Sequence, residues 1–445
     1  MKKYIILLSA FVIAISGIFI FMKVMDRHYG IENQSGAISS ATSSGVTNSS
    51  TPGSIHGEGT VHQLNSDDNI DNPEGNYVNQ TELVFTGKLS DEDWKKRQSV
   101  GMSNEKIVAT MSENEGLYSY DNMDADKRQL YAEILIVLQN QATDIPLCSN
   151  HPQDIEDVTA YVLLDHPEIF YMDGYTYEKY MFAGNIQKID YTPNYTMTGE
   201  EIAQAETLIA QYVETCLKDV PQNATDYEKV KYIYEYVILN TEYLLDAPEN
   251  QNICSVFIYR QSVCLGYAKA VQYLLQQLDV NTAVVTGTVL SGEGHAWNMV
   301  KIGEQYYYVD ATWGDASYLS DVGETQSLST INYDYLCITT MDISHTHIIN
   351  HPIKLPSCIS QIENYYVKEG LYIVNLDSLT LEHIFDEAYA NKQDCVSIRC
   401  ANLSVFNDVQ TQLLNNQQIF QYLSSDTATL AYTRNEKLYT YTFML

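Results

Sequence analysis

Three residues have the types that cysteine-dependent acyl transfer requires: Cys264, His295 and Asp310. In this chemistry a thiolate attacks a carbonyl, an imidazole moves the proton, and a carboxylate fixes the tautomer of the imidazole. Taken singly, each residue has a commoner structural explanation, since a cysteine in a helix is usually a small core residue. A cysteine at a helix start, a histidine at a strand start and an aspartate across the next hairpin are rarely found together by chance. The sequence therefore predicts that they form one catalytic group.

The segment that carries Cys264 has the pattern of a helix beginning. Ser262 is a candidate cap, and apolar residues follow at helical spacing as far as Leu278. Unpaired N–H groups and the dipole at a helix start favour a thiolate, and the same N–H groups could hold an oxyanion. Gly266 lacks a side chain, so backbone or substrate can approach closely. We expect Cys264 in the first helical turn, with its thiol activated.

His295 and Asp310 lie on two strand-like runs, 295–302 and 305–312, separated by Gly303-Glu304. A glycine-containing pair between such runs indicates a two-residue hairpin turn. Residues whose numbers sum to 607 then face each other, which puts Asp310 opposite Trp297. Trp297 shares a sheet face with His295, so His295 and Asp310 become diagonal neighbours. The predicted register thus pairs the histidine with the aspartate, but it does not place Cys264.

The three motifs resemble a known family. The segments SVCLGYAKAVQYLL, GHAWNMV and YYYVDATWGD are similar to the core of the transglutaminase-like superfamily, whose Cys–His–Asp triad follows the same chain order. The resemblance covers residues 226–318, and the upstream segment DHPEIFY resembles what accompanies this core in some bacterial surface proteins. It implies a papain-like α+β core in which a helix carrying the cysteine packs on an antiparallel sheet.

Two further residues have candidate roles at this site. Trp297 would wall the cleft beside the nucleophile, although ordinary packing explains it equally well. Gln261 would supply an oxyanion donor as a glutamine does in papain-like enzymes, although it stands closer to the cysteine than in the papain pattern. Cys254 is a competing nucleophile, but its apolar surroundings (NICSVFIY) favour a buried structural cysteine.

The implied activity is acyl transfer on protein or peptide amides through a thioester. Water as acceptor gives a peptidase or amidase, and an amine gives a transglutaminase crosslink. We favour hydrolysis, because water is always present and nothing marks a lysine-binding channel. The alternative is a non-catalytic surface-binding or scaffolding module on the same fold. We expect no cofactor, since the triad needs none and no calcium-loop pattern is present.

The elements around the motifs predict an α+β fold with several parts. Helices are expected at 126–140, 154–164 and 264–278, after a cap at Thr198 with Glu201 as its partner, and from a cap at Asp226 to about 240. A strand is expected at 281–290. We divide the chain into a mainly helical region (82–225), a transglutaminase-like core (226–350) and a small C-terminal α/β or β domain (351–445).

The amino terminus indicates export. Lys2 and Lys3 precede an uncharged apolar run from Tyr4 to Met22, which is long enough to span a bilayer and lacks a clear cleavage site. We predict a signal-anchor helix at 1–25 and a disordered Ser/Thr/Gly-rich tether at 26–81. The protein would then be a single-pass membrane protein with an extracytoplasmic globular part, or a secreted protein if the first segment is cleaved.

Charge and cysteine usage exclude other classes of function. The net charge is −32, from 57 acidic and 25 basic residues, so nucleic-acid phosphate is repelled and we expect no nucleic-acid partner. The 8 cysteines are dispersed without a CxxC pair, which gives no support for a metal site or a disulfide scaffold. One or two structural disulfides remain open.

Overall fold

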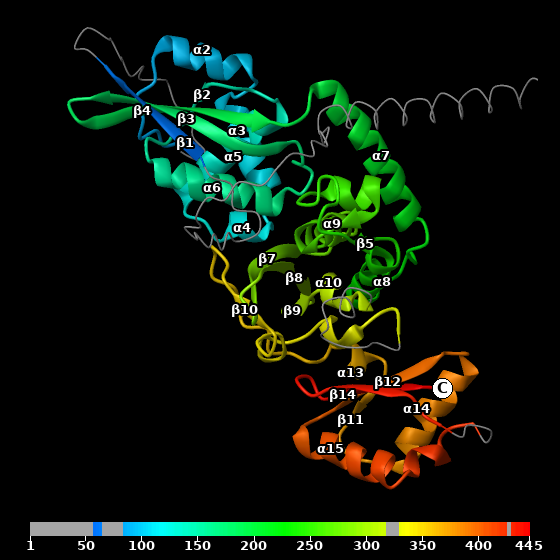
Figure 1. Ribbon diagram of the computed structural model, residues 1–445. Coiled ribbons are helices and arrows are strands. Elements are labelled where there is room, and N and C mark those ends of the chain that lie inside the picture. The colour runs from blue at the N-terminus through cyan, green and yellow to red at the C-terminus, as the bar shows by residue number, and fades with distance from the viewer. Residues whose placement is uncertain (1–56, 65–82, 317–328, 425–428) are drawn as a thin grey trace, which may run out of the picture.

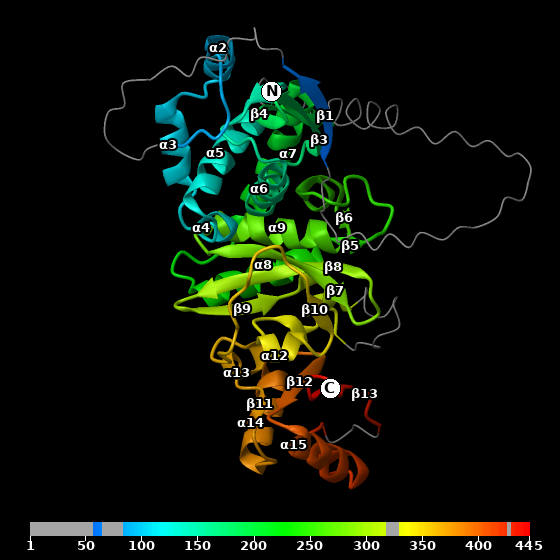
Figure 2. The same ribbon diagram turned by 90° about the vertical axis from the view of Figure 1, so that its left-hand side faces the viewer.

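The computed structural model describes residues 57–64, 83–316, 329–424 and 429–445. Its described part is an α+β fold, as predicted, in which three four-stranded sheets lie one after another along the long axis of the molecule (Figures 1 and 2). The first sheet belongs to the N-terminal region, the second to the region with the three motifs, and the third to the C-terminal domain.

The N-terminal region combines helices with a sheet of order β1-β3-β4-β2. Its strands are β1 (Gly57–Gln63), β2 (Ile145–Pro146), β3 (Met172–Phe182) and β4 (Asn185–Tyr195). Its helices are α2 (Asp91–Ser99), α3 (Asn104–Glu113), α4 (Tyr118–Asp121), α5 (Ala125–Gln139) and α6 (Pro152–Asp165). The α5 and α6 helices match the predicted ones, but the long β3–β4 hairpin within 82–225 was not predicted.

Strand β1 corrects part of the predicted tether. We expected disorder throughout 26–81, yet residues 57–63 pair in parallel with β3. Gly57 and Gly59 make this pairing possible, because an added Cβ would lie 2.1 Å from the Tyr175 ring and 2.6 Å from the Tyr177 ring. Glycine here therefore reflects close contact with aromatic rings and not flexibility.

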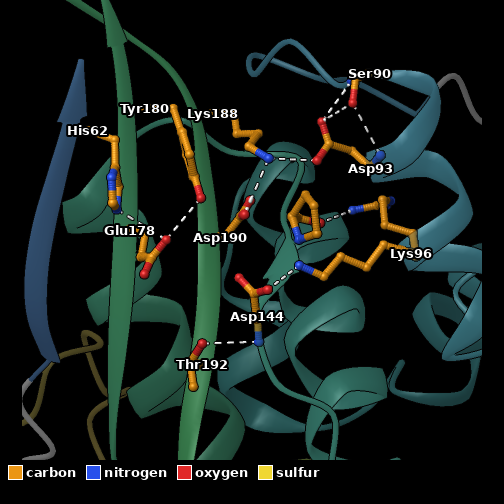
Figure 3. Close-up of polar contacts among 12 residues, drawn as sticks. His62, Ser90, Asp93, Lys96, Asp144, Glu178, Tyr180, Lys188, Asp190 and Thr192 are labelled. Carbon is orange, nitrogen blue, oxygen red and sulfur yellow. Dashed lines mark hydrogen bonds and ion pairs between the residues drawn. The ribbon is translucent and has the colours of Figure 1, made fainter. Parts of the chain in front are cut away.

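A polar network joins α2 to strand β4 of this sheet (Figure 3). Lys188 of β4 lies 2.6 Å from Asp93 of α2 and 3.2 Å from Asp190. Burial raises the pKa of Asp190 to about 6, because its charged form loses water while Lys188 compensates only in part. Lys96 of the same helix forms an ion pair with Asp144. The helix is thus held beside the sheet by two sets of ion pairs, of which those of Lys188 are more deeply buried than that of Lys96.

Two helices lead from the first sheet to the core. The α7 helix (Gly199–Leu217) begins with the predicted capping box of Thr198 and Glu201. The α8 helix (Asp226–Leu239) was predicted to be capped by Asp226, but its cap is Thr225. Thr225 accepts the N–H of Glu228, whose carboxylate binds back to the cap residue, so the cap is reciprocal.

The core packs α9 (Cys264–Gln276) on an antiparallel sheet of order β10-β7-β8-β9. The strands are β7 (Thr282–Val289), β8 (Gly294–Ile302), β9 (Gln305–Val309) and β10 (His347–Ile349). The register of β8 and β9 has the predicted sum of 607, as in the pair Asn298 and Val309. The second strand was predicted to reach Thr312 but ends at Val309, because Asp310 caps the short helix α10 (Ala311–Gly314).

The C-terminal domain is a mixed sheet of order β11-β12-β14-β13 with helices beside it. Its strands are β11 (Tyr372–Ile373), β12 (Cys395–Cys400), β13 (Tyr432–Asn435) and β14 (Thr440–Met444), and its longer helices are α14 (Ser378–Ala390) and α15 (Leu403–Asp408). It has a buried cluster of its own that includes Phe385, Ile398 and Phe443.

Short elements join these units. The pair β5 (Glu242–Tyr243) and β6 (Gln261–Ser262) precedes α9, with a π-helical turn at Ser255–Tyr259. Beyond α10 come a 3-10 turn (Tyr333–Tyr335), α12 (Thr340–Ile343) and α13 (Tyr365–Lys368). The C-terminal domain adds a π-helical turn (Val409–Asn415) and a 3-10 turn (Gln418–Gln421).

The predicted signal-anchor lies outside the described residues, as does the predicted tether before residue 57. In the ranges that the structure does describe, none of the helices combines the length and apolar character needed to cross a membrane.

Candidate active site

The α9 helix begins at Cys264 without a side-chain cap. Its N-cap residue is Val263, which has no side chain able to accept a hydrogen bond. Ser262, which we expected to be the cap, instead has its hydroxyl 2.6 Å from the Ser255 hydroxyl. Among the described residues, no capping side chain therefore occupies the N–H groups of the first turn beside Cys264. This is the condition in which they can bind a developing oxyanion.

Gly266 fixes how this helix start meets the preceding loop. An added Cβ would lie 2.0 Å from Ser262 Oγ and 2.6 Å from Ser255 Oγ. Only hydrogen fits there, but the nearest groups are the hydroxyls of these two serines and not the backbone or substrate that we expected. Their contact holds the first turn of α9 against the segment that ends at Ser262.

The first turn of α9 packs against the start of strand β8. Cys264, Leu265 and Ala268 share a buried cluster with Ala296, the neighbour of His295. One turn further along, the Asn298 side chain donates to the Ala268 carbonyl at 2.9 Å. These contacts hold the helix start beside the strand start, which the hairpin register alone could not predict.

His295 is paired with Asp310 as the register predicted. His295 Nε2 lies 2.7 Å from Asp310 Oδ2, and both side chains are buried. The imidazole also interacts with the thiol of Cys264. Burial alone would lower the pKa of His295, but the charge and hydrogen bond of Asp310, with a smaller contribution from Cys264, raise it to about 10. The imidazole is thus stabilised in its protonated form between the other two residues.

Asp310 is held on all sides. Its Oδ1 accepts the backbone N–H groups of Thr312 at 3.0 Å and Trp313 at 3.1 Å, which is the capping of α10. Its own N–H donates to the Tyr335 carbonyl at 3.0 Å. Burial opposes its charge, but the hydrogen bonds and the charge of His295 lower the pKa of Asp310 far below its ordinary value. The carboxylate is therefore ionised and fixed in orientation.

A second histidine, His347, reaches the same carboxylate and was not predicted. Its Nε2 lies 3.0 Å from Asp310 Oδ2, and its Nδ1 lies 2.7 Å from Thr346 Oγ1. His347 comes from β10, which pairs with β7 through His347 and Val289. In the sequence it stands 37 positions after Asp310 in DISHTHIIN, and no local pattern relates the two. Only the strand pairing brings it to the site.

The two histidines and Asp310 are also close enough together to resemble metal ligands. Their ligand atoms lie within 4.8 Å of one another. Asp310 Oδ2, however, is already the acceptor of both imidazole Nε2 atoms at hydrogen-bond distances. The grouping is explained by these hydrogen bonds, and we treat it as a hydrogen-bonded set.

The other predicted site residues lie in different surroundings. The Trp297 ring is buried and stacks on the His295 ring with centroids 5.9 Å apart, whereas its predicted role in the cleft stays a prediction. The Gln261 side chain donates to Glu242 at 2.9 Å, which engages the amide that was expected to serve the oxyanion. Cys254 is buried, and burial raises its pKa well above the ordinary value, as a structural cysteine requires.

Comparison with known proteins finds a family that part of the chain resembles. Residues 214–311 match the model of the transglutaminase-like superfamily. No curated protein shows significant similarity to the chain. Similar solved structures include a TGase, with 15% identity, a TM-score of 0.23 and coverage of 31% of this chain and 51% of that one.

Two further structures show weak similarity. A candidate cysteine protease from Cytophaga hutchinsonii shares 14% identity with a TM-score of 0.22, covering 31% of this chain and 61% of that one. The periplasmic domain of TgpA from Pseudomonas aeruginosa shares 16% identity with a TM-score of 0.19, covering 29% and 58%. This chain thus spans less than two thirds of each. The family resemblance therefore belongs to residues 214–311, a region similar to the transglutaminase-like superfamily that includes Cys264, His295 and Asp310.

Proposed function

We propose that this protein is an enzyme that transfers acyl groups from protein or peptide amides through Cys264, His295 and Asp310. One observation carries the proposal: a single buried imidazole binds Asp310 at 2.7 Å and also interacts with the thiol at the uncapped start of α9. The match of residues 214–311 to the superfamily model supports the same conclusion.

The geometry supports a covalent mechanism in two steps. His295 takes the proton of the Cys264 thiol, and Asp310 holds the Nε2–H of the imidazolium. The thiolate attacks the amide carbon, and the N–H groups of the first turn of α9 bind the oxyanion. His295 then protonates the leaving amine, the C–N bond breaks, and a thioester with Cys264 remains. In the second step an acceptor gives a proton to His295 and attacks the thioester, which frees Cys264.

The acceptor decides whether the enzyme is a hydrolase or a crosslinking transferase. Water would release a carboxylic acid, and a primary amine would give a new amide. We favour hydrolysis, because water needs no binding site of its own. We propose further that the globular part works outside the cytoplasm, held to the membrane by the N-terminal segment or released by its cleavage. The support for this location is the apolar run from Tyr4 to Met22.

The proposal is tested by labelling the intact protein with iodoacetamide at pH 6 and mapping the adducts. An ordinary thiol, with a pKa near 8.5, is under about 1% thiolate at this pH and reacts slowly. We expect Cys264 to react at least about 100 times faster than Cys395, which is the most exposed of the other cysteines. The advantage should be lost in His295→Ala. Cys264 reacting no faster than Cys395 would contradict catalysis and favour a non-catalytic binding module.

Mass spectrometry then separates the two activities. A peptide with internal glutamine is incubated with the enzyme, with and without a primary amine such as cadaverine. A gain of one water on a cut peptide indicates a peptidase, conversion of glutamine to glutamate indicates an amidase, and a cadaverine adduct indicates a transglutaminase. We expect a hydrolysis product even when the amine is present, and its absence in Cys264→Ala. An adduct formed in preference to hydrolysis would overturn the choice of water.

A further inference from the structure

His347 is buried among aromatic rings, where a polar side chain without hydrogen-bond partners would destabilise the fold. It is 2% exposed, and the rings of Trp297, Trp313 and Tyr335 lie around it at centroid distances of 5.0, 4.7 and 5.9 Å. A buried imidazole needs a hydrogen-bond partner for each nitrogen. Both are present, on Asp310 and on Thr346. Asp310 and Thr346 are its side-chain partners, and the Ile343 carbonyl also acts on the ring.

The partners assign the tautomer of His347. A carboxylate only accepts hydrogen bonds, so Nε2 must carry the proton that points to Asp310 Oδ2. Burial and the charge of His295 lower the pKa of His347 by more than Asp310 raises it, which favours the neutral imidazole. Neutral imidazole has one N–H, and Nδ1 therefore accepts from the Thr346 hydroxyl at 2.7 Å, which is a nearer acceptor for that proton than the Ile343 carbonyl at 3.3 Å. The charged and titratable groups that face His347 are Asp310, His295 and the phenol of Tyr335.

We propose that His347 is a positioning residue of the acyl-transfer site, whose Nε2–H holds Asp310 Oδ2 at the point where that oxygen binds His295. The inference rests on the proposed function. Backbone N–H groups fix Oδ1, whereas in the part of the chain that the structure describes Oδ2 is held by the two imidazoles. His295 is an unreliable anchor by itself, because it loses and regains a proton in every cycle. A neutral donor that does not react keeps the carboxylate in place throughout.

The support from His347 matters most in the step that follows protonation of the leaving amine. His295 is then neutral, and its bond to Asp310 is weaker than the earlier ion pair. If the carboxylate turned at this point, the imidazole could turn with it and present the wrong nitrogen to the thioester. His347 holds Oδ2 through this interval. Its contribution is therefore orientation, and a misplacement of about 1 Å at such a site can cost about 100-fold in rate.

A pair of variants separates the hydrogen bond from the packing. His347→Gln places an amide N–H where Nε2 stands, whereas His347→Leu fills the space without a donor. We expect both to lower the melting temperature by similar amounts. At pH 6, alkylation of Cys264 should stay within about threefold of wild type in His347→Gln and fall at least about tenfold in His347→Leu. The alkaline limb, which His295 places near pH 10, should move to lower pH in His347→Leu only.

A milder variant protects the test against misfolding. Thr346→Val removes the hydroxyl that orients Nδ1 and leaves the imidazole in place, and we expect a smaller loss of rate than in His347→Leu. Equal rates and equal pH profiles in wild type, Gln and Leu variants would overturn the role of His347 while Cys264 remained reactive. A wild-type Cys264 no more reactive than Cys395 would instead overturn the proposed function itself.

Discussion

Replacing Asp310 by asparagine changes one atom at the centre of the site and tests the whole arrangement. Asp310 now accepts four N–H groups: Oδ1 from Thr312 and Trp313, and Oδ2 from His295 and His347. In Asp310→Asn the amide oxygen can accept the two backbone N–H groups, and the NH₂ group then points toward the imidazoles. Nε2 of His295 must then accept, so its proton moves to Nδ1, on the Cys264 side. The imidazole can no longer take the thiol proton.

The size of the effect follows from the protonation of His295. A pKa of about 10 against an ordinary 6.5 corresponds to roughly 5 kcal/mol in favour of the imidazolium, and the favourable part of that shift comes first from Asp310. Loss of this preference is equivalent to a factor of about 10³–10⁴ in rate. We expect a loss of this order in turnover, and at least about 100-fold slower alkylation of Cys264 at pH 6.

The assay compares Asp310→Asn with Asp377→Asn under the same conditions. Asp377 also caps a helix, through Thr380, but it stands on the exposed start of α14 in the C-terminal domain. The control variant should label Cys264 at the wild-type rate. Circular dichroism checks that both variants are folded. If Asp310→Asn reacted within threefold of wild type while folded, the assignment of Asp310 as the partner of the catalytic imidazole would be wrong.

Three further predictions concern stability. The pKa of His295 is higher in the folded than in the unfolded protein, so its ion pair stabilises the fold fully below pH 6.5 and progressively less up to pH 10. The difference in unfolding free energy between wild type and His295→Gln, from urea titrations, should therefore shrink from pH 7 to pH 10, and a constant difference would contradict it. Gly266→Ala should lower the free energy of unfolding by about 1–3 kcal/mol, because its Cβ would meet Ser262 Oγ at 2.0 Å. An unchanged urea midpoint would disprove the tight contact. Lys188→Met should lower the free energy of unfolding by about 3–5 kcal/mol near pH 7. The loss should be smaller at pH 5, because Asp190, with a pKa of about 6, becomes neutral there. The same loss at both pH values would refute the prediction.

Local signals in the sequence were sufficient for the hairpin that carries two of the site residues. Gly303-Glu304 fixed the turn, and the turn fixed the register, so His295 and Asp310 could be paired without any knowledge of the fold. The capping box at Thr198 is local in the same sense, since its partner stands three residues away. Such features depend on neighbours in sequence, which is why they are readable from it.

The features that were missed depend on contacts between distant segments. Strand β1 has a composition typical of a linker, and its pairing becomes intelligible only beside the rings of Tyr175 and Tyr177. His347 lies in a three-residue strand too short for a periodic pattern, and its place beside Asp310 follows from the pairing of β10 with β7. Both errors have one physical cause, because the partner that gives each residue its role is remote in the sequence.

An ion pair joins the C-terminal domain to the segment before His347, and we expect its removal to change the reactivity of Cys264. Arg399 of β12 lies 2.5 Å from Asp342, which completes the capping box that Thr339 forms at the start of α12, and both side chains are over nine-tenths buried. The chain then turns toward His347 through the bond from Thr346 N–H to the Ile343 carbonyl. The C-terminal sheet thus anchors the segment that leads into β10.

Arg399→Leu would leave Asp342 buried without its cation, which costs about 3–5 kcal/mol when one partner of a buried pair is lost. Arg434→Leu is the matched control, because its pair with Glu436 is exposed and such pairs are worth at most about 1 kcal/mol. We expect Arg399→Leu to lower the urea midpoint and to slow alkylation of Cys264 by a few-fold, with neither change in Arg434→Leu. A destabilised Arg399→Leu protein with wild-type alkylation would show that the domain stabilises the fold without supporting the site. Slower alkylation would instead show that the triad depends on a domain outside the region that matches the superfamily, because α12 and β10 carry the support of Asp310.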